Sequence, residues 1–174
     1  MLEWHIMNQA QEKILDIGCG IYKMPGAIGI DIDPESHADI THDLNVYPYP
    51  VADNSLDKIF AKHIIEHLND PRRFMKEIHR ILKPGGTAFL ETPHFSSYVA
   101  YSEPQHRFFF SYFMFDHILP SKSFEVLKQE ITFYKTFRMF GIKSLANKFP
   151  RNYERFWTYL FPAENVTILL RKIF

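Results

Sequence analysis

The sequence has little cysteine and no long apolar run. Its 174 residues contain one cysteine, Cys19, which cannot form an intramolecular disulfide. A disulfide-stapled secreted scaffold is therefore excluded, and we expect a reducing, cytoplasmic environment. The longest strongly apolar stretch, residues 108–115, is far shorter than the roughly 20 residues that a membrane-spanning helix needs. The opening residues include Glu3 and lack the cationic and apolar regions of a signal peptide.

An excess of charge of either sign is also absent. The 20 basic residues balance 20 acidic ones, so there is no overall basic field and we expect no nucleic-acid partner. Hydrophobic residues make up 46% and charged residues 23%, which is typical of a folded globular chain. The length predicts one domain over residues 1–174, in which residues 1–12 form an N-terminal extension.

Aromatic residues are abundant, with 17 Phe, 9 Tyr and 2 Trp. Many of them fall in residues 94–120, a segment that could line a pocket for an acceptor molecule or pack as core and lid. Others fall in residues 135–160, where six basic residues accompany one acidic residue, Glu154. The overall neutrality therefore hides a basic, aromatic segment.

Short apolar runs alternate with turn signals between residues 13 and 92, which is typical of an α/β fold. Between two of these runs, Asp70 is a candidate N-cap and Pro71 a candidate first residue of a helix. A strand, a helix and a strand in succession favour a right-handed parallel crossover. The predicted strands cover residues 13–17, 27–32, 38–41, 56–61, 87–92, 124–134 and 166–173.

Polar or glycine-containing turns follow four successive predicted strands. Because ligands bind at the carboxyl ends of parallel strands, these turns should meet around one cleft. Glycines let the backbone approach a ligand closely, and a strand-end carboxylate can accept hydrogen bonds from both hydroxyls of a ribose. The pattern predicts a nucleoside-type ligand, and the four turns are residues 16–20, Asp31, Asp43-Leu44 and Lys62-His63.

These segments resemble the class I S-adenosylmethionine-dependent methyltransferases, most nearly a subgroup that includes quinone-biosynthesis-like enzymes. The matching stretches are ILDIGCG (14–20), GIDID (29–33), HDL (42–44) and the run over residues 53–86. The resemblance implies a single-domain, Rossmann-like sheet of seven mostly parallel strands with an antiparallel edge strand. It also implies methyl transfer from S-adenosylmethionine to a small-molecule acceptor by in-line displacement, with S-adenosylhomocysteine as product.

The resemblance assigns cofactor-binding roles to residues at these strand ends. The first turn would lie against the methionine and ribose, Asp31 would hold the ribose, and Asp43 would hold the adenine amino group. Ile32 or Leu44 would pack on the adenine ring. The full set is Asp16, Gly18, Cys19, Gly20, Asp31, Ile32, Asp43, Leu44 and Lys62.

The chain departs from the family pattern in two ways. Tyr22 stands where a third glycine is common, and the spacing leaves room only for shortened first and second helices. One face of the sheet would then lose part of its cover, and we expect residues 135–160 to pack there or to form a homodimer contact. These departures also motivate the alternative of a non-catalytic binding module or partner subunit.

Three histidines, His63, His94 and His106, are candidates for a general base, with a structural or capping role as the alternative for each. Residues 63–67 also match the H-x-x-E-H pattern of inverted zinc proteases, but no independent motif for a third ligand is evident, so we predict no metal site. A dinucleotide-dehydrogenase fingerprint would need glycine at Lys23 and a later acid than Asp31.

Overall fold

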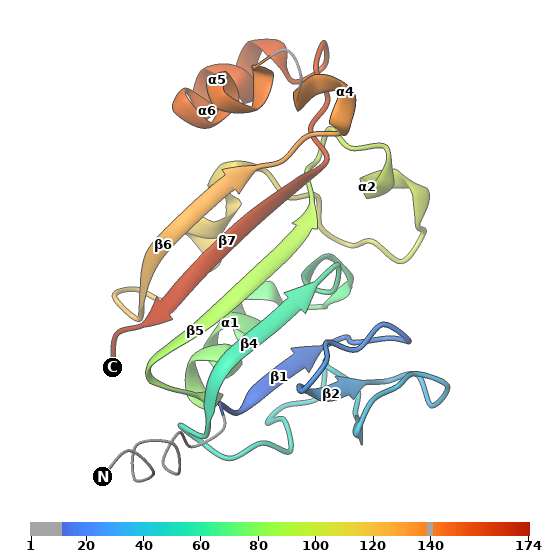
Figure 1. Cartoon of the computed structure of the whole chain (residues 1–174), viewed down its shortest axis with the longest axis vertical. Coiled ribbons are helices and arrows are strands. Elements are labelled where there is room, and N and C mark those ends of the chain that lie inside the picture. Colours follow the sequence, from blue (N-terminus) through green and yellow to red (C-terminus); the bar gives the residue numbers. More distant parts are fainter. Residues whose placement is uncertain (1–11, 139–140) are drawn as a thin grey trace, which may run out of the picture.

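The chain folds into one seven-stranded sheet in a computed structural model that describes residues 12–138 and 141–174 (Figure 1). The predicted N-terminal extension, residues 1–12, lies outside the described residues except for Glu12. The strands are β1 (Ile14–Ile17), β2 (Ile28–Asp31), β3 (Ile40–Thr41), β4 (Leu56–Lys62), β5 (Leu82–Pro93), β6 (Phe124–Ile131) and β7 (Asn165–Lys172).

The order of the strands is β3-β2-β1-β4-β5-β7-β6. β1 to β5 pair in parallel, whereas β7 runs antiparallel to both β5 and β6. The predicted Rossmann-like sheet with an antiparallel edge strand is therefore confirmed. The edge strand itself is β6, because β7 lies inside the sheet between β5 and β6.

The helical segments are short apart from α1. They are η2 (Ile65–His67), α1 (Pro71–Ile81), α2 (Val99–Ser102), η3 (Tyr112–Met114), α3 (Phe115–Ile118), α4 (Lys135–Arg138), α5 (Ile142–Lys148), α6 (Pro150–Asn152) and η4 (Tyr153–Trp157). Among the described residues, none of them is long and apolar enough to cross a bilayer.

α1 begins as the sequence predicts. The Asp70 side chain accepts a hydrogen bond from the Arg73 backbone N–H at 3.0 Å, and Pro71 is the first helical residue. The buried face of α1 carries Phe74 and Ile78, which belong to the main core beneath one face of the sheet. Full burial of such a side chain is worth about 1.5–3 kcal/mol.

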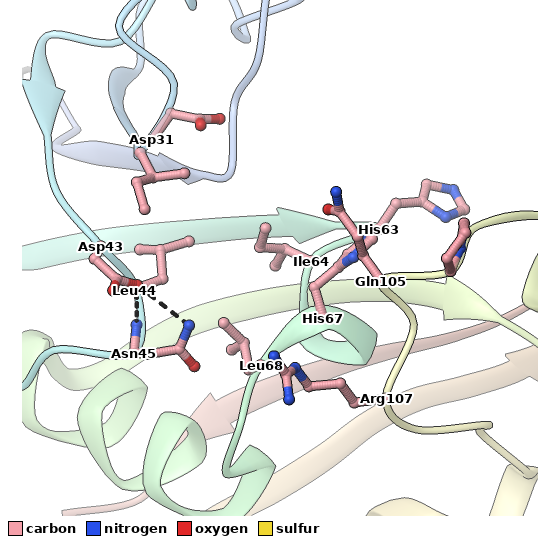
Figure 2. Close-up of a pocket in the computed structure, with 12 residues that line it drawn as sticks. Asp31, Asp43, Leu44, Asn45, His63, Ile64, His67, Leu68, Gln105 and Arg107 are labelled. Atoms are coloured by element: carbon pink, nitrogen blue, oxygen red, sulfur yellow. Dashed lines mark hydrogen bonds between the residues drawn. The ribbon is translucent and has the colours of Figure 1, made fainter.

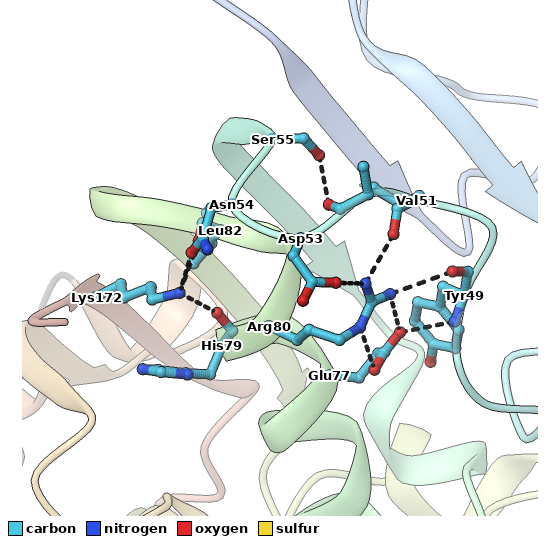
Figure 3. A network of polar contacts seen from close by, with 11 residues as sticks. Tyr49, Val51, Asp53, Asn54, Ser55, Glu77, His79, Arg80, Leu82 and Lys172 are labelled. Atoms are coloured by element: carbon cyan, nitrogen blue, oxygen red, sulfur yellow. Dashed lines mark hydrogen bonds and ion pairs between the residues drawn. The ribbon is translucent and has the colours of Figure 1, made fainter.

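Polar networks connect the ends of these elements (Figure 3). Arg80 on α1 pairs with Asp53 and Glu77, and Glu77 accepts a hydrogen bond from the Tyr49 backbone N–H. Lys172, which is buried at the end of β7, donates to three oxygens at 2.7–2.9 Å. These contacts attach the segment before β4 and the end of β7 to α1.

The expected shortened helices are absent from the described residues, because turns alone join β1 to β2 and β2 to β3. In the part of the chain that the structure describes, no helix between these strands covers the sheet face opposite α1. Phe60 and Phe89 on that face are only partly buried, with ring centroids 6.2 Å apart.

Residues 135–160 do not take the predicted place on this face. As far as the structure describes them, they form helices beyond the carboxyl end of β6 (Figure 1). There Ala146 and Tyr153 pack with Phe133 in a second core cluster. The packing alternative was wrong because these aromatics bury one another and the end of β6, away from β1 and β2. The homodimer contact stays a prediction.

Candidate functional site

A cavity of about 600 Å³ opens at the carboxyl ends of β2 and β4 (Figure 2). Asp31, Asp43 and Asn45 lie on one side of it and Gln105 and Arg107 on the other, with apolar side chains between them. The volume lies in the range of small-molecule and cofactor sites. The lining residues are Asp31, Ile32, Asp43, Leu44, Asn45, His63, Ile64, His67, Leu68, Pro104, Gln105 and Arg107.

The glycine turn after β1 contacts two of the residues that line this cavity, Asp31 and Ile64. Gly18 has a φ of +67°, and a Cβ there would stand 2.7 Å from the Ile64 side chain, so the position requires glycine. Gly20 also has a positive φ, but a Cβ added to it would meet nothing within 4 Å. The Gly20 backbone N–H donates to Asp31 Oδ2 at 2.8 Å. The turn is thus tied to the end of β2 and leaves open space beside its backbone.

The two acids of the cavity retain free acceptor capacity. Asp31 accepts backbone N–H bonds from Gly20 and, at 3.0 Å, from Asp33. Asp43 Oδ1 accepts bonds from the Asn45 backbone and side chain at 2.9 and 3.2 Å. Because an ionised carboxylate has about four acceptor positions, each acid can hold a ligand donor in addition to these bonds.

The cavity brings together part of the predicted set. Asp31, Ile32, Asp43 and Leu44 line it, as does His63. Gly18 and Gly20 do not line the cavity, but the Gly20 backbone N–H donates to Asp31, which does.

Three residues of the predicted set lie elsewhere. Asp16 is buried and accepts a hydrogen bond from the Met24 backbone N–H, and its burial raises the pKa of the carboxyl. The Cys19 thiol is buried against Gly29, and burial raises its pKa as well. The Lys62 ammonium lies over the Phe89 ring, 5.8 Å from its centroid. None of these three side chains lines the cavity. Asp16 and Cys19 contact the connection between β1 and β2, and Lys62 contacts β5.

Two of the three candidate histidines, His63 and His94, occupy different environments. His63 has a φ of +52° and lies between Glu66 (3.5 Å) and Glu91 (3.6 Å), which raise the pKa of its imidazole to about 9. His94 is fully buried and does not line the cavity. Its ring nitrogens contact Ser96 Oγ at 2.8 Å and Glu154 Oε1 at 3.2 Å, which is a structural arrangement.

The comparisons with known proteins agree with this geometry. Residues 15–90 match the family model described as a methyltransferase domain. A demethylmenaquinone methyltransferase of Chlorobaculum parvum is 31% identical over 105 residues, which are 51% of this chain and 44% of that protein. A probable S-adenosylmethionine-dependent methyltransferase of Mycolicibacterium smegmatis is 33% identical, over 48% of this chain and 39% of that protein.

Over residues 15–90 the chain resembles the S-adenosylmethionine-dependent methyltransferases. The fold of this chain agrees with that of a crystal structure from Archaeoglobus fulgidus, with a TM-score of 0.67, 20% identity and coverage of 98% and 90% of the two chains. A Haemonchus contortus phosphoethanolamine N-methyltransferase, solved with S-adenosylmethionine, gives 0.63 at 18% identity over 92% and 48%. The match spans less than half the length of the curated relatives named above.

Sequence reasoning missed the residues on the far wall of the cavity. Gln105 and Arg107 lie more than 60 residues after the acids in the sequence, so the spacing of strand ends gave no signal for them. His67 was considered only as a zinc-protease ligand. Ile64 and Leu68 belong to the segment after β4. The turn at the start of this segment was predicted to reach the cleft, but these two side chains were not predicted to line it.

Proposed function

We propose that this chain binds S-adenosylmethionine in the cavity and transfers its methyl group to a small-molecule acceptor. The observation that carries the proposal is the pair of carboxylates, Asp31 and Asp43, that face one cavity, with Asp31 hydrogen-bonded to the glycine turn. A nucleoside needs acceptors for its ribose hydroxyls and for its adenine amino group. The free acceptor positions of the two acids fit those two needs.

The chain's own residues would position the cofactor as follows. Asp31 would accept both ribose hydroxyls, and Asp43 would accept the adenine amino group. Leu44 is buried and Ile32 is exposed, and both would give apolar contact to the ring. The open space at Gly20 would let the backbone approach the ribose and the methionine portion.

Bound S-adenosylmethionine supplies a methyl group on a positively charged sulfur. The acceptor would enter beside Gln105 and Arg107, across the cavity from Asp31. Its nucleophilic atom would attack the methyl carbon from about 3–3.5 Å while the methyl–sulfur bond breaks and the electron pair stays on sulfur. His63, with its pKa raised to about 9, is protonated near pH 7 and cannot accept a proton there.

A non-catalytic binding module is the second candidate, favoured by the absent helices among the described residues. Such a module could bind the nucleoside and show no turnover. The name of the Chlorobaculum parvum relative makes demethylmenaquinone the first small acceptor to try.

The first test is calorimetric titration of the purified chain with S-adenosylhomocysteine. Saturable binding of one ligand per chain is expected, and no binding at millimolar ligand would overturn the proposal. The second test is release of S-adenosylhomocysteine from S-adenosylmethionine with a panel of hydroxylated and amine acceptors. Binding together with acceptor-dependent release supports an enzyme, whereas binding without release from any acceptor favours the module.

A further inference from the structure

Three metal-ligating side chains meet at the wall of the cavity. Ligand atoms of Glu66, His67 and His106 all lie within 4.8 Å of one another. Glu66 and His67 belong to η2, whereas His106 comes from the loop after α2. The Glu66 carbonyl accepts backbone N–H bonds from Arg107 at 2.8 Å and Phe108 at 3.2 Å, which hold that loop against η2. The cluster is therefore built by backbone contacts.

Glu66 carries a buried oxygen that lacks a hydrogen bond. The residue is 1% exposed, and its Oε2 accepts a bond from Thr92 Oγ1 at 3.0 Å. Its Oε1 has no hydrogen-bond partner in the structure, and His63 Nδ1 stands 3.5 Å away, at the limit of a hydrogen bond. Glu66 Oε1 is thus ion-paired with the His63 imidazole but accepts no hydrogen bond, so it keeps acceptor positions that a metal ion could use.

His106 is oriented as a metal ligand would be. Its side chain is 4% exposed, and Nδ1 lies 2.9 Å from the Ala100 carbonyl oxygen, to which it donates. This hydrogen bond leaves the lone pair on Nε2, which is how metal-bound histidines are commonly held. The rings of His67 and His106 meet edge to face with centroids 4.6 Å apart.

A fourth possible ligand, a carboxylate oxygen of Glu103, lies at the exposed side of the cluster. Glu103 Oε2 is 4.0 Å from His67 Nε2 and 3.9 Å from His106 Nε2. Both distances are too long for hydrogen bonds, yet the two nitrogens face the same oxygen. Two imidazoles and a carboxylate, with a further position open, form the donor set of catalytic zinc sites and of related transition-metal sites.

We propose that Glu66, His67 and His106 bind one divalent transition-metal ion, with Glu103 able to close the exposed side. This assignment differs from the protease pattern in the sequence, because His63 is not among the three ligands. The proposal departs from the prediction of no metal site because it takes as third ligand His106, which is 39 positions beyond His67.

The ion would lie on the side of the cavity where the acceptor is expected. His67 lines the cavity, and the neighbours of His106, Gln105 and Arg107, line it too. An acceptor hydroxyl bound to the ion would lose its proton more readily, so an oxygen acceptor is the class that this site favours. That assignment of the acceptor rests on the proposed function, whereas binding of the ion does not.

The test uses the full chain without an affinity tag, stripped with a chelator and dialysed. Co²⁺ is titrated and followed by visible absorbance, and Zn²⁺ is titrated by calorimetry, both without S-adenosylmethionine. One ion per chain is expected. His106→Gln and Glu66→Gln should each weaken binding by at least about ten-fold. His117→Gln, a control at an exposed position on α3, should bind as the unmodified chain does.

The absence of saturable binding of either ion would overturn the proposal, as would equal binding by His106→Gln. Circular dichroism of each variant confirms that the fold is retained. Glu66→Gln loses part of a buried contact, so His106→Gln carries the decision if the Glu66 variant unfolds. S-adenosylhomocysteine titration of the chelator-treated chain tests the proposed function separately, because it contains no metal.

Discussion

Replacement of Asp31 separates ribose binding from folding. Each ribose hydroxyl that donates to an ionised carboxylate is worth about 1.5–3 kcal/mol. Asp31→Asn keeps the shape and one acceptor oxygen, so it should cost about 1.5–3 kcal/mol, or roughly 10- to 150-fold in the Kd for S-adenosylhomocysteine. Asp31→Ala removes both acceptors and should weaken binding by about 150-fold or more.

The effect on folding should be small by comparison. Asp31 accepts hydrogen bonds from the backbone N–H groups of Gly20 and Asp33, which are part-buried or exposed. Water can take the place of the carboxylate as their acceptor. We expect Asp31→Ala to lower the free energy of unfolding by about 1 kcal/mol.

Calorimetric titration and urea unfolding of the same preparations measure the two effects of the Asp31 substitutions. Asp33→Asn is the matched control, because Asp33 is an exposed carboxylate two positions away that does not line the cavity. If Asp31→Ala binds S-adenosylhomocysteine within three-fold of the unmodified chain, the assignment of the ribose to Asp31 is wrong.

Three further substitutions test the scaffold. Gly18→Ala places a Cβ 2.7 Å from Ile64 at a φ of +67°, so urea unfolding should show a loss of about 1–3 kcal/mol and titration should show weaker S-adenosylhomocysteine binding. Lys172→Met leaves three oxygen acceptors without their donor and should lower the free energy of unfolding by about 2–4 kcal/mol; no change would show that the network is dispensable. The Lys23 hydrogen bond holds the pKa of Asp39 below its ordinary 3.8, so the unfolded chain takes up that proton at higher pH than the folded one. The stabilisation that ionised Asp39 contributes should be complete above pH 3.8 and should fall as the pH drops through the lower pKa of the folded chain. Unfolding curves from pH 5 to 2 should therefore show a smaller dependence on acid for Asp39→Asn.

Local signals in the sequence predicted the elements that create the cavity. The run that ends at Gly18, the acid at the end of β2 and the Asp70-Pro71 start of α1 each depend on neighbouring residues only. Asp31 and Asp43 could be placed at one edge because parallel strands align their carboxyl ends. These are the parts in which local chemistry and topology agree.

Long-range packing determined what the sequence could not predict. The position of residues 135–160 depends on which aromatic partners they bury, and Tyr153 packs beside Phe133 in a cluster of its own. His106 reaches Glu66 because the backbone N–H groups of the next two residues, Arg107 and Phe108, donate to the Glu66 carbonyl oxygen. His94 follows a strand end as expected, yet Glu154, 60 positions later, fixes its ring in the interior.

A crystal structure of this chain grown with S-adenosylhomocysteine tests the central assignment most directly. The expected result is one ligand in the cavity, with the ribose hydroxyls within hydrogen-bond distance of Asp31 and the adenine amino group beside Asp43. A ligand bound elsewhere, or a ribose turned away from Asp31, would contradict the assignment.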